Sequence, residues 1–337
     1  MSQPDNEGPY SQPKDEMPAP VDAVPGRHSQ LSIRKKQRGV WGLIALGIYL
    51  VGLGSGYLVW GRTLPGSGSN TTKANADLDA LFEEVNPSAG VELPVRYGGF
   101  APELIAAGVI DYAQFVKLYQ EIGAPLSEQQ IAILKEGIDA PVIMSKENQH
   151  FLLNLFWALG LVNKNKILTE GPMMRKGRNQ VVNYASTGGW TLASKPVSEL
   201  YASLPILALT SEQQERLEEV AAGVYRPCCD NPTHFPDCNH GMAMLGLLEL
   251  MASQGASVDE MFAAAKTVNA FWFPQQALEV AVLFKETENV EFSQAEARQV
   301  VGQPLFSGSG FQVVHQWLAQ NGKLGQVPEG GGSCGVK

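Results

Sequence analysis

Three of the four cysteines in this 337-residue chain lie within eleven positions of one another. Cys228 and Cys229 are adjacent. Cys238 follows nine residues after Cys229, and His240 stands two residues after Cys238. Thiolate and imidazole are the usual protein ligands of Zn²⁺ and Cu(I), and thiolates are also redox groups. This spacing predicts a metal site or a thiol site between residues 228 and 240.

The first interpretation is a metal centre, and its predicted ligands are Cys228, Cys229, Cys238 and His240, with His234 as a further candidate. A structural Zn²⁺ site takes four ligands, whereas Cu(I) accepts two or three thiolates. Met242 or Met244 could add a soft thioether contact. The expected cofactor is therefore Cu(I) or Zn²⁺. Because the sequence contains no Gly-rich phosphate loop, no nucleotide cofactor is expected.

Three other residues are weaker candidates for metal binding. Cys334 lies in the Gly-rich C-terminal tail. Glu147 and His150 stand three residues apart at the head of an apolar segment, as do Asp237 and His240. Paired helices with this spacing hold two metal ions in ferritin-like bundles, but that fold also takes carboxylates from other helices. The ordinary interpretation of His150 is a helix cap or a satisfied core residue.

Two further interpretations use the same cysteines without a metal. A structural disulfide between Cys238 and one of the adjacent pair would suit an oxidising compartment, and the chain would then be a non-catalytic binding or assembly module. Alternatively the thiols are redox-active, with Cys334 as the resolving partner of a thiol oxidoreductase. No Ser-centred nucleophile elbow or zinc-protease motif is present, so no catalytic constellation is identified.

The elements that must position these residues are predicted to be helices. Cys238 stands at the head of an apolar helix over Asn239–Ser253, where unpaired backbone N–H groups favour a thiolate. Capping residues and helical periodicity place the other main helices at residues 77–85, 102–107, 111–122, 127–137, 145–162, 211–222, 257–285 with a break at Pro274, 293–301 and 311–321. Residues 180–184 are the best candidate for a strand. The expected fold class is mostly α.

One segment predicts a membrane anchor. Residues 39–60 carry no charge and, as a helix, would span about 33 Å, which is enough to cross a bilayer. Four basic residues crowd its N-terminal side, namely Arg34, Lys35, Lys36 and Arg38. The positive-inside rule then places the N-terminus in the cytoplasm and the C-terminal domain outside it. We expect a single-pass protein of the cell membrane.

The predicted organisation has five parts: a disordered cytoplasmic tail (1–38), a transmembrane helix (39–60), a flexible linker (61–74), one helical extracytoplasmic domain (75–325) and a flexible tail (326–337). Residues 75–337 carry 17 basic and 29 acidic residues, a net charge of −12, which argues against a nucleic-acid partner. The expected partners are the lipid bilayer and another membrane protein. Gly52 and Gly56 form a GxxxG pair that could join two anchors, although the pair is a weak signal in so glycine-rich a segment.

Overall fold

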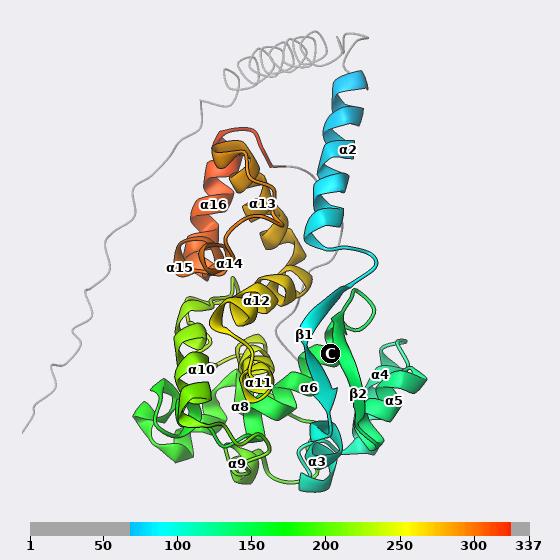
Figure 1. Cartoon of the computed structure of the whole chain (residues 1–337), viewed down its shortest axis with the longest axis vertical. Helices are drawn as coiled ribbons and strands as arrows, with labels where there is room; N and C mark the ends of the chain where they lie inside the picture. Colours follow the sequence, from blue (N-terminus) through cyan, green and yellow to red (C-terminus); the bar gives the residue numbers. More distant parts are fainter. Residues whose placement is uncertain (1–67, 325–337) are drawn as a thin grey trace, which may run out of the picture. The chain divides into compact units, whose positions relative to one another are not determined.

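The computed structural model describes residues 68–324, with side-chain surroundings from residue 77 (Figure 1). From Ser69 onward these residues belong to one unit. The predicted tail (1–38), anchor (39–60) and C-terminal tail (326–337) lie outside the described residues. Among the helices between residues 68 and 324, none combines the length and the apolar character needed to span a bilayer.

The described part is mostly helical, as predicted, and two helices form its centre. They are α6 (Gln149–Val162) and α11 (Asn239–Ser253). Twelve of the fourteen residues of α6 and fourteen of the fifteen residues of α11 are buried. A helix that is buried on all sides must be covered by other elements, so these two helices are the core of the fold.

The central helices touch backbone to backbone at two glycines. A Cβ atom built on Gly160 would lie 2.2 Å from the carbonyl oxygen of Met242, and one built on Gly246 would lie 2.2 Å from that of Phe156. No side chain fits at either position. Toward the C-terminal ends of the two helices, Glu249 of α11 lies near Asn163, the residue that follows α6. At their N-terminal ends, His150 of α6 interacts with His240 of α11. The two helices therefore run in the same general direction. Their N-terminal ends therefore lie at the same end of the core.

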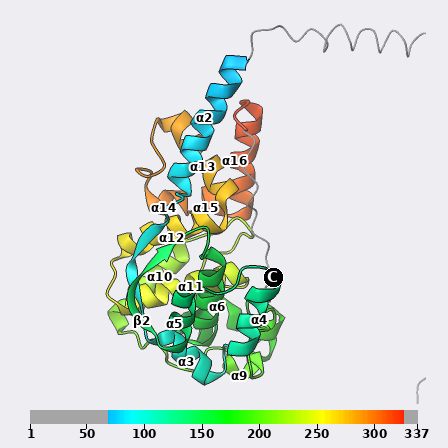
Figure 2. The ribbon, with the colours of Figure 1, turned by 90° about the vertical axis from the view of Figure 1, so that its right-hand side faces the viewer.

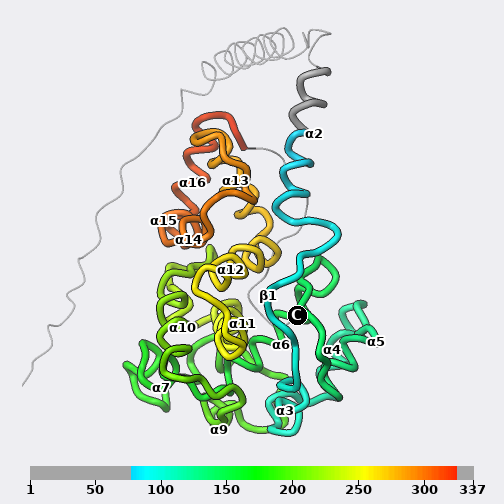
Figure 3. The backbone as a smooth tube through the Cα atoms, viewed as in Figure 1, coloured from blue at the N-terminus to red at the C-terminus, as the bar shows by residue number. Residues whose placement is uncertain are grey.

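Other helices cover this pair, and Figures 2 and 3 show their arrangement. Against the pair pack α3 (Phe100–Ala107), α8 (Ala185–Gly188), α10 (Ser211–Gly223) and α12 (Val258–Trp272). A second group beyond α12 consists of α13 (Pro274–Glu288), α14 (Ala297–Val300), α15 (Gln303–Phe306) and α16 (Gly308–Gln320). The remaining helical elements are α2 (Gly68–Val85), α4 (Tyr112–Glu121), α5 (Glu128–Lys135), α7 (Lys166–Thr169), η1 (Pro172–Lys176), η2 (Arg178–Asn183) and α9 (Val197–Leu200).

Side-chain caps fix where several of these helices begin. Ser127, Thr210 and Ser257 each accept a hydrogen bond from a backbone N–H three residues later, and the residue at that third position bonds back to the cap. These capping boxes satisfy backbone donors that the first helical turn leaves unpaired. The predicted caps Ser127 and Ser257 are confirmed, and of Thr210 and Ser211, either of which the sequence allowed as the cap of the charged helix, the structure has Thr210.

Other predicted boundaries differ from the structure. The helix expected from residue 145 begins at Gln149, and the helix expected over 293–301 is the single turn α14. Helix α2 begins at Gly68, inside the stretch interpreted as a linker. The prediction of a strand at residues 180–184 is wrong, because residues 178–183 form the 3₁₀ helix η2. In such a helix the backbone hydrogen bonds join residues three apart in the same segment, so they are not made to a neighbouring strand.

The strands of the described part are β1 (Val91–Gly98) and β2 (Ile138–Met144), which pair antiparallel. Val91 lies opposite Met144, and Gly98 lies opposite Ile138. In β1, buried Leu93, Val95 and Tyr97 alternate with exposed residues. One face of this two-stranded sheet therefore packs on the helical core while the other faces solvent.

Candidate metal centre

The loop between α10 and α11 carries the three described cysteines and is tied to the fold through its backbone. The N–H of Thr233 donates to the carbonyl of Val224 (2.8 Å), and that of His234 donates to Ala221 (2.8 Å). At its far end the carbonyl of Asp237 accepts from the N–H of Ser186 in α8 (3.0 Å). These bonds fold the loop back on itself, so residues ten positions apart come together.

The start of α16 holds the adjacent cysteine pair in place. The Gly308 N–H donates to the carbonyl of Cys229 (2.8 Å), and the Ser309 N–H donates to the carboxylate of Asp230 (2.7 Å). The hydrogen bond from Ser309 lowers the pKa of Asp230. An acidic side chain at a helix N-terminus is favoured by the helix dipole, so Asp230 fixes the loop to α16.

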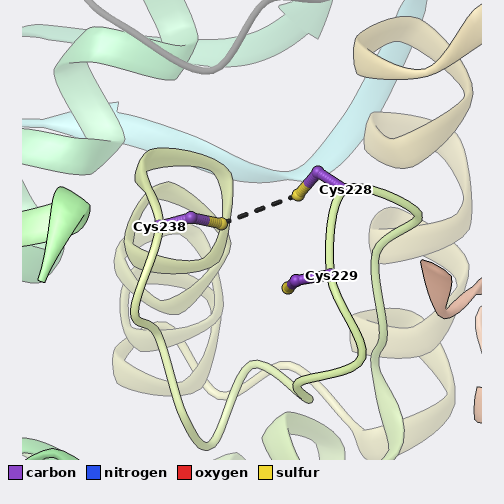
Figure 4. A group of neighbouring side chains, drawn as sticks. All are labelled: Cys228, Cys229 and Cys238. Atoms are coloured by element: carbon purple, nitrogen blue, oxygen red, sulfur yellow. Dashed lines mark hydrogen bonds between the residues drawn. The ribbon is translucent and has the colours of Figure 1, made fainter. Parts of the chain in front are cut away.

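The sulfur atoms of Cys228, Cys229 and Cys238 all lie within 4.8 Å of one another. Figure 4 shows Cys228 and Cys229 on the loop, with their side chains directed toward Cys238 at the head of α11. A hydrogen bond joins the Sγ atoms of Cys228 and Cys238 at 3.7 Å. Cys228 is exposed, while Cys229 and Cys238 are half-buried. The three-cysteine cluster is close enough to hold one metal ion.

A buried arginine lies behind the cluster. The side chain of Arg226 is 2% exposed, and its Nε donates to the Sγ of Cys238 at 2.9 Å. Its other nitrogens donate to the carbonyl oxygens of Asn231 and Phe235, both at 3.0 Å, and to the carboxylate of Asp237 at 2.7 Å. The guanidinium thus joins three parts of the loop to one sulfur, and every partner is an acceptor.

The first turn of α11 leaves room for this guanidinium. A Cβ atom on Gly241 would lie 2.5 Å from both Cζ and Nη2 of Arg226. The Gly241 N–H also points at the Sγ of Cys238, which is the N-cap of α11, at 3.4 Å. The helix end and the arginine therefore converge on the same sulfur.

These contacts favour a thiolate at Cys238. Hydrogen bonds with Cys228 and Cys229, followed by the charge of Arg226, hold the pKa of Cys238 well below its usual value. Burial alone would lower the pKa of Arg226, but the negative charge of the cysteines, led by Cys238, raises it. For Asp237 burial dominates and raises the pKa, although Arg226 acts in the opposite direction.

The predicted histidine ligands do not belong to the group of converging donor atoms. His240 is buried between aromatic rings, with ring centroids 4.6 Å from Phe273 and 5.7 Å from Trp272. Its Nδ1 is buried without a hydrogen bond. His234 is half-buried in the same loop.

Of the weaker candidates, Cys334 lies outside the described residues. Met242 and Met244 are buried in the core of α11. Glu147 is exposed and bonded to Ser145, and the ring of His150 packs 5.5 Å from that of Tyr119. The structure does not bring Glu147 and His150 into a metal-binding group with Asp237 and His240.

No disulfide joins the described cysteines. The 3.7 Å between the sulfurs of Cys228 and Cys238 is far longer than an S–S bond of about 2.05 Å. The structural disulfide considered as an alternative is therefore not present in this structure.

Sequence reasoning missed Arg226. A buried arginine is rare, so its position two residues before the cysteine pair is ordinarily taken as solvent-facing. The available signal was its place between Tyr225 and Pro227 in a loop with three thiols, since a cation so close to several potential anions has an electrostatic reason to be buried. Comparisons of the chain with protein-family models, curated proteins and solved structures found no match.

Proposed function

We propose that this chain is a membrane-anchored protein that binds one soft metal ion, Cu(I) or Zn²⁺, on the extracytoplasmic side. The observation that carries the proposal is the convergence of three cysteine sulfurs within 4.8 Å, in a part of the molecule where backbone hydrogen bonds hold Cys229 and Cys238. Thiolates bind both ions strongly.

The spacing of the sulfurs agrees with the size of such an ion. With metal–sulfur bonds of about 2.3 Å, sulfur atoms lie about 3.8 Å apart in a tetrahedral site and about 4.0 Å apart in a trigonal one. The Cys228 and Cys238 sulfurs are already 3.7 Å apart. Small rotations of the cysteine side chains are enough to close the site around an ion.

The location is supported by the sequence of the N-terminal part. The uncharged stretch at residues 39–60 follows a cluster of four basic residues, and only Arg62 and Lys73 follow it closely. This pattern is typical of an anchor that keeps its N-terminus in the cytoplasm. A partner in the same membrane is part of the proposal, since a tethered metal-binding domain reaches other membrane proteins readily.

The test of this function is metal content. The full-length chain, purified in detergent and reduced without oxygen, should hold about one Cu(I) or Zn²⁺ per molecule when either is offered alone, because one cluster supplies one set of thiolates. Cys238→Ser should lose the ion, and Cys334→Ser serves as the matched control that keeps the cluster. Metal-free protein with all thiols reduced would refute the proposal.

A second candidate, a thiol oxidoreductase, is favoured by the 3.7 Å between Cys228 and Cys238. A small external disulfide would form a mixed disulfide with the exposed Cys228 and release one thiol. The Cys238 thiolate would then attack the Cys228 sulfur, forming the protein disulfide and expelling the second thiol. Two results together would favour this candidate instead. The purified chain would reduce a small disulfide, and Cys238→Ser would lose this activity. The unaltered chain would also bind no metal.

A further inference from the structure

We infer that the three-cysteine cluster is a three-coordinate copper(I) site that opens to solvent at Cys228. This inference rests on the proposed function and names the ion and its coordination. Three observations carry it: the wall formed by Arg226, the engagement of the other donors near the cluster, and the graded exposure of the cysteines.

The inner side of the cluster offers no fourth ligand. Arg226 lies there, fully buried, with its Nε on the Cys238 sulfur and its remaining nitrogens on carbonyl and carboxylate oxygens. A guanidinium has donors and no lone pair to give to a metal, and it stays charged. Any fourth protein ligand approaching from inside would have to displace this cation from its four acceptors.

The carboxylate of Asp237, the residue before Cys238, is already engaged. One oxygen of Asp237 accepts from Arg226 at 2.7 Å, and the other accepts from the side-chain amide of Asn231 at 2.8 Å. Turning Asp237 toward a metal would break both bonds and take from the buried arginine its carboxylate partner. Leaving a buried charge without its partner is strongly unfavourable.

The histidine at the head of α11 does not join the three sulfurs. The ring of His240 is enclosed by Phe273 and Trp272, and among the His, Cys, Asp and Glu side chains of residues 77–324 only the three cysteines form a group close enough for one ion. The protein therefore presents three sulfur ligands and no nitrogen or oxygen ligand from this region.

The outer side of the cluster is open, because Cys228 is exposed while the other two cysteines are half-buried. Zn²⁺ with three protein ligands adds a water at the fourth position, whereas Cu(I) is satisfied by two or three soft ligands. An all-sulfur set of three, which no His, Asp or Glu of residues 77–324 joins, suits Cu(I) better than tetrahedral zinc. The exposed Cys228 is then the ligand at which the ion arrives and departs.

The experiment compares the two ions on the full-length, reduced chain in detergent. Cu(I) is titrated against bathocuproine disulfonate and Zn²⁺ against a chromogenic zinc chelator, and X-ray absorption reports the atoms bound to copper. We expect one Cu(I) per chain with three sulfur neighbours, and Cu(I) held against a competitor concentration that strips Zn²⁺.

Variants separate the ligands from their neighbours. Cys228→Ser, Cys229→Ser and Cys238→Ser should each weaken Cu(I) binding by more than about 100-fold, the upper end of what changes around metal ligands cost. His240→Gln and Cys334→Ser should leave it unchanged within about twofold. Circular dichroism confirms that each variant is folded, and the absorption spectrum of the unaltered chain tests the coordination without any variant.

Two results would overturn the inference while leaving the proposed function intact. One is Zn²⁺ held more firmly than Cu(I). The other is evidence of a fourth ligand. This would be a nitrogen or oxygen neighbour of copper, or a fall of more than about tenfold in Cu(I) affinity in His240→Gln or Cys334→Ser. If neither ion binds while the thiols are reduced, the proposed function itself is wrong.

Discussion

The most informative single residue of this protein is Arg226. Its guanidinium is buried, yet each nitrogen has an acceptor: the Cys238 sulfur, two backbone carbonyls and Asp237. The cost of removing this charge from water is offset only because several partners act together. The same contacts hold the residues on either side of the loop against α11. Arg226 is therefore a positioning residue for the cluster and a structural centre of the loop.

Replacing Arg226 should weaken metal binding and stability together. Arg226→Gln removes the charge and leaves the half-buried Asp237 without its cation, so we expect a loss of about 3 kcal/mol in unfolding free energy, the lower end for broken buried pairs. Metal affinity should fall by about 10- to 100-fold, because an outer partner of a ligand is lost. Chemical denaturation and chelator competition measure the two effects.

The charge-preserving control is Arg226→Lys. A lysine keeps the cation but cannot make the planar set of bonds, so it should recover part of the affinity and little of the stability. Full metal affinity in Arg226→Gln would show that the arginine has no influence on the cluster.

At the scale of elements, the pairing of α6 with α11 determines where the site can form. The close approach at Gly160 and Gly246 brings the N-terminal ends of both helices to one side of the core. Cys238 caps one of these ends. At the opposite end of the pair, Glu249 of α11 is fully buried near the amides of Asn163 and Asn165, and burial raises its pKa well above the usual value.

This buried carboxyl should make stability depend on pH. Because its pKa in the folded state lies above the value of 4.5 expected without burial, folding favours the protonated form. Its contribution is present below pH 4.5 and is lost as the pH rises toward the raised pKa. Glu249→Gln keeps the shape without the ionisable group, so at pH 7 we expect it to gain about 1 kcal/mol or more in unfolding free energy.

The gain from Glu249→Gln should shrink as the pH is lowered from 7 toward 4, and thermal melts across this range measure it. The exposed Glu215 of α10 provides the control, since Glu215→Gln should change stability by no more than about 0.5 kcal/mol. A destabilised Glu249→Gln at pH 7 would mean that the carboxylate is ionised and well paired in the folded protein.

The elements also show which parts of the fold a sequence can predict. Helices with Ser or Thr caps were predicted correctly because the cap and the residue three positions later interact locally. Strand β1 was missed, although its residues alternate, because Pro94 argues against a strand interior. A proline is tolerated there because each strand of a two-stranded sheet is an edge. Such partners, close in space and distant in sequence, are not visible in the pattern.

At the scale of the whole molecule, the three sulfurs were predictable and their surroundings were not. Cys228, Cys229 and Cys238 are marked by residue type and spacing alone. The wall made by Arg226 depends on Gly241, fifteen positions away, and the position of His240 depends on Phe273, which lies between α12 and α13. Whether a residue other than a cysteine can reach the metal is decided by the tertiary fold, because contacts between residues distant in sequence do not show in the sequence pattern.

The proposed location of this site can be tested on the intact protein in cells. If residues 39–60 anchor the chain, it should stay with membranes after carbonate extraction, and Leu50→Arg should weaken insertion, since a basic residue at the centre of a span costs about 2.5–3.5 kcal/mol. With the N-terminus in the cytoplasm, the exposed Cys228 should react with a membrane-impermeant maleimide added to unbroken cells. Cys228→Ser, tested beside Cys334→Ser, identifies the labelled thiol. Labelling of Cys228 only after lysis would place the cluster on the cytoplasmic side and contradict the proposed orientation.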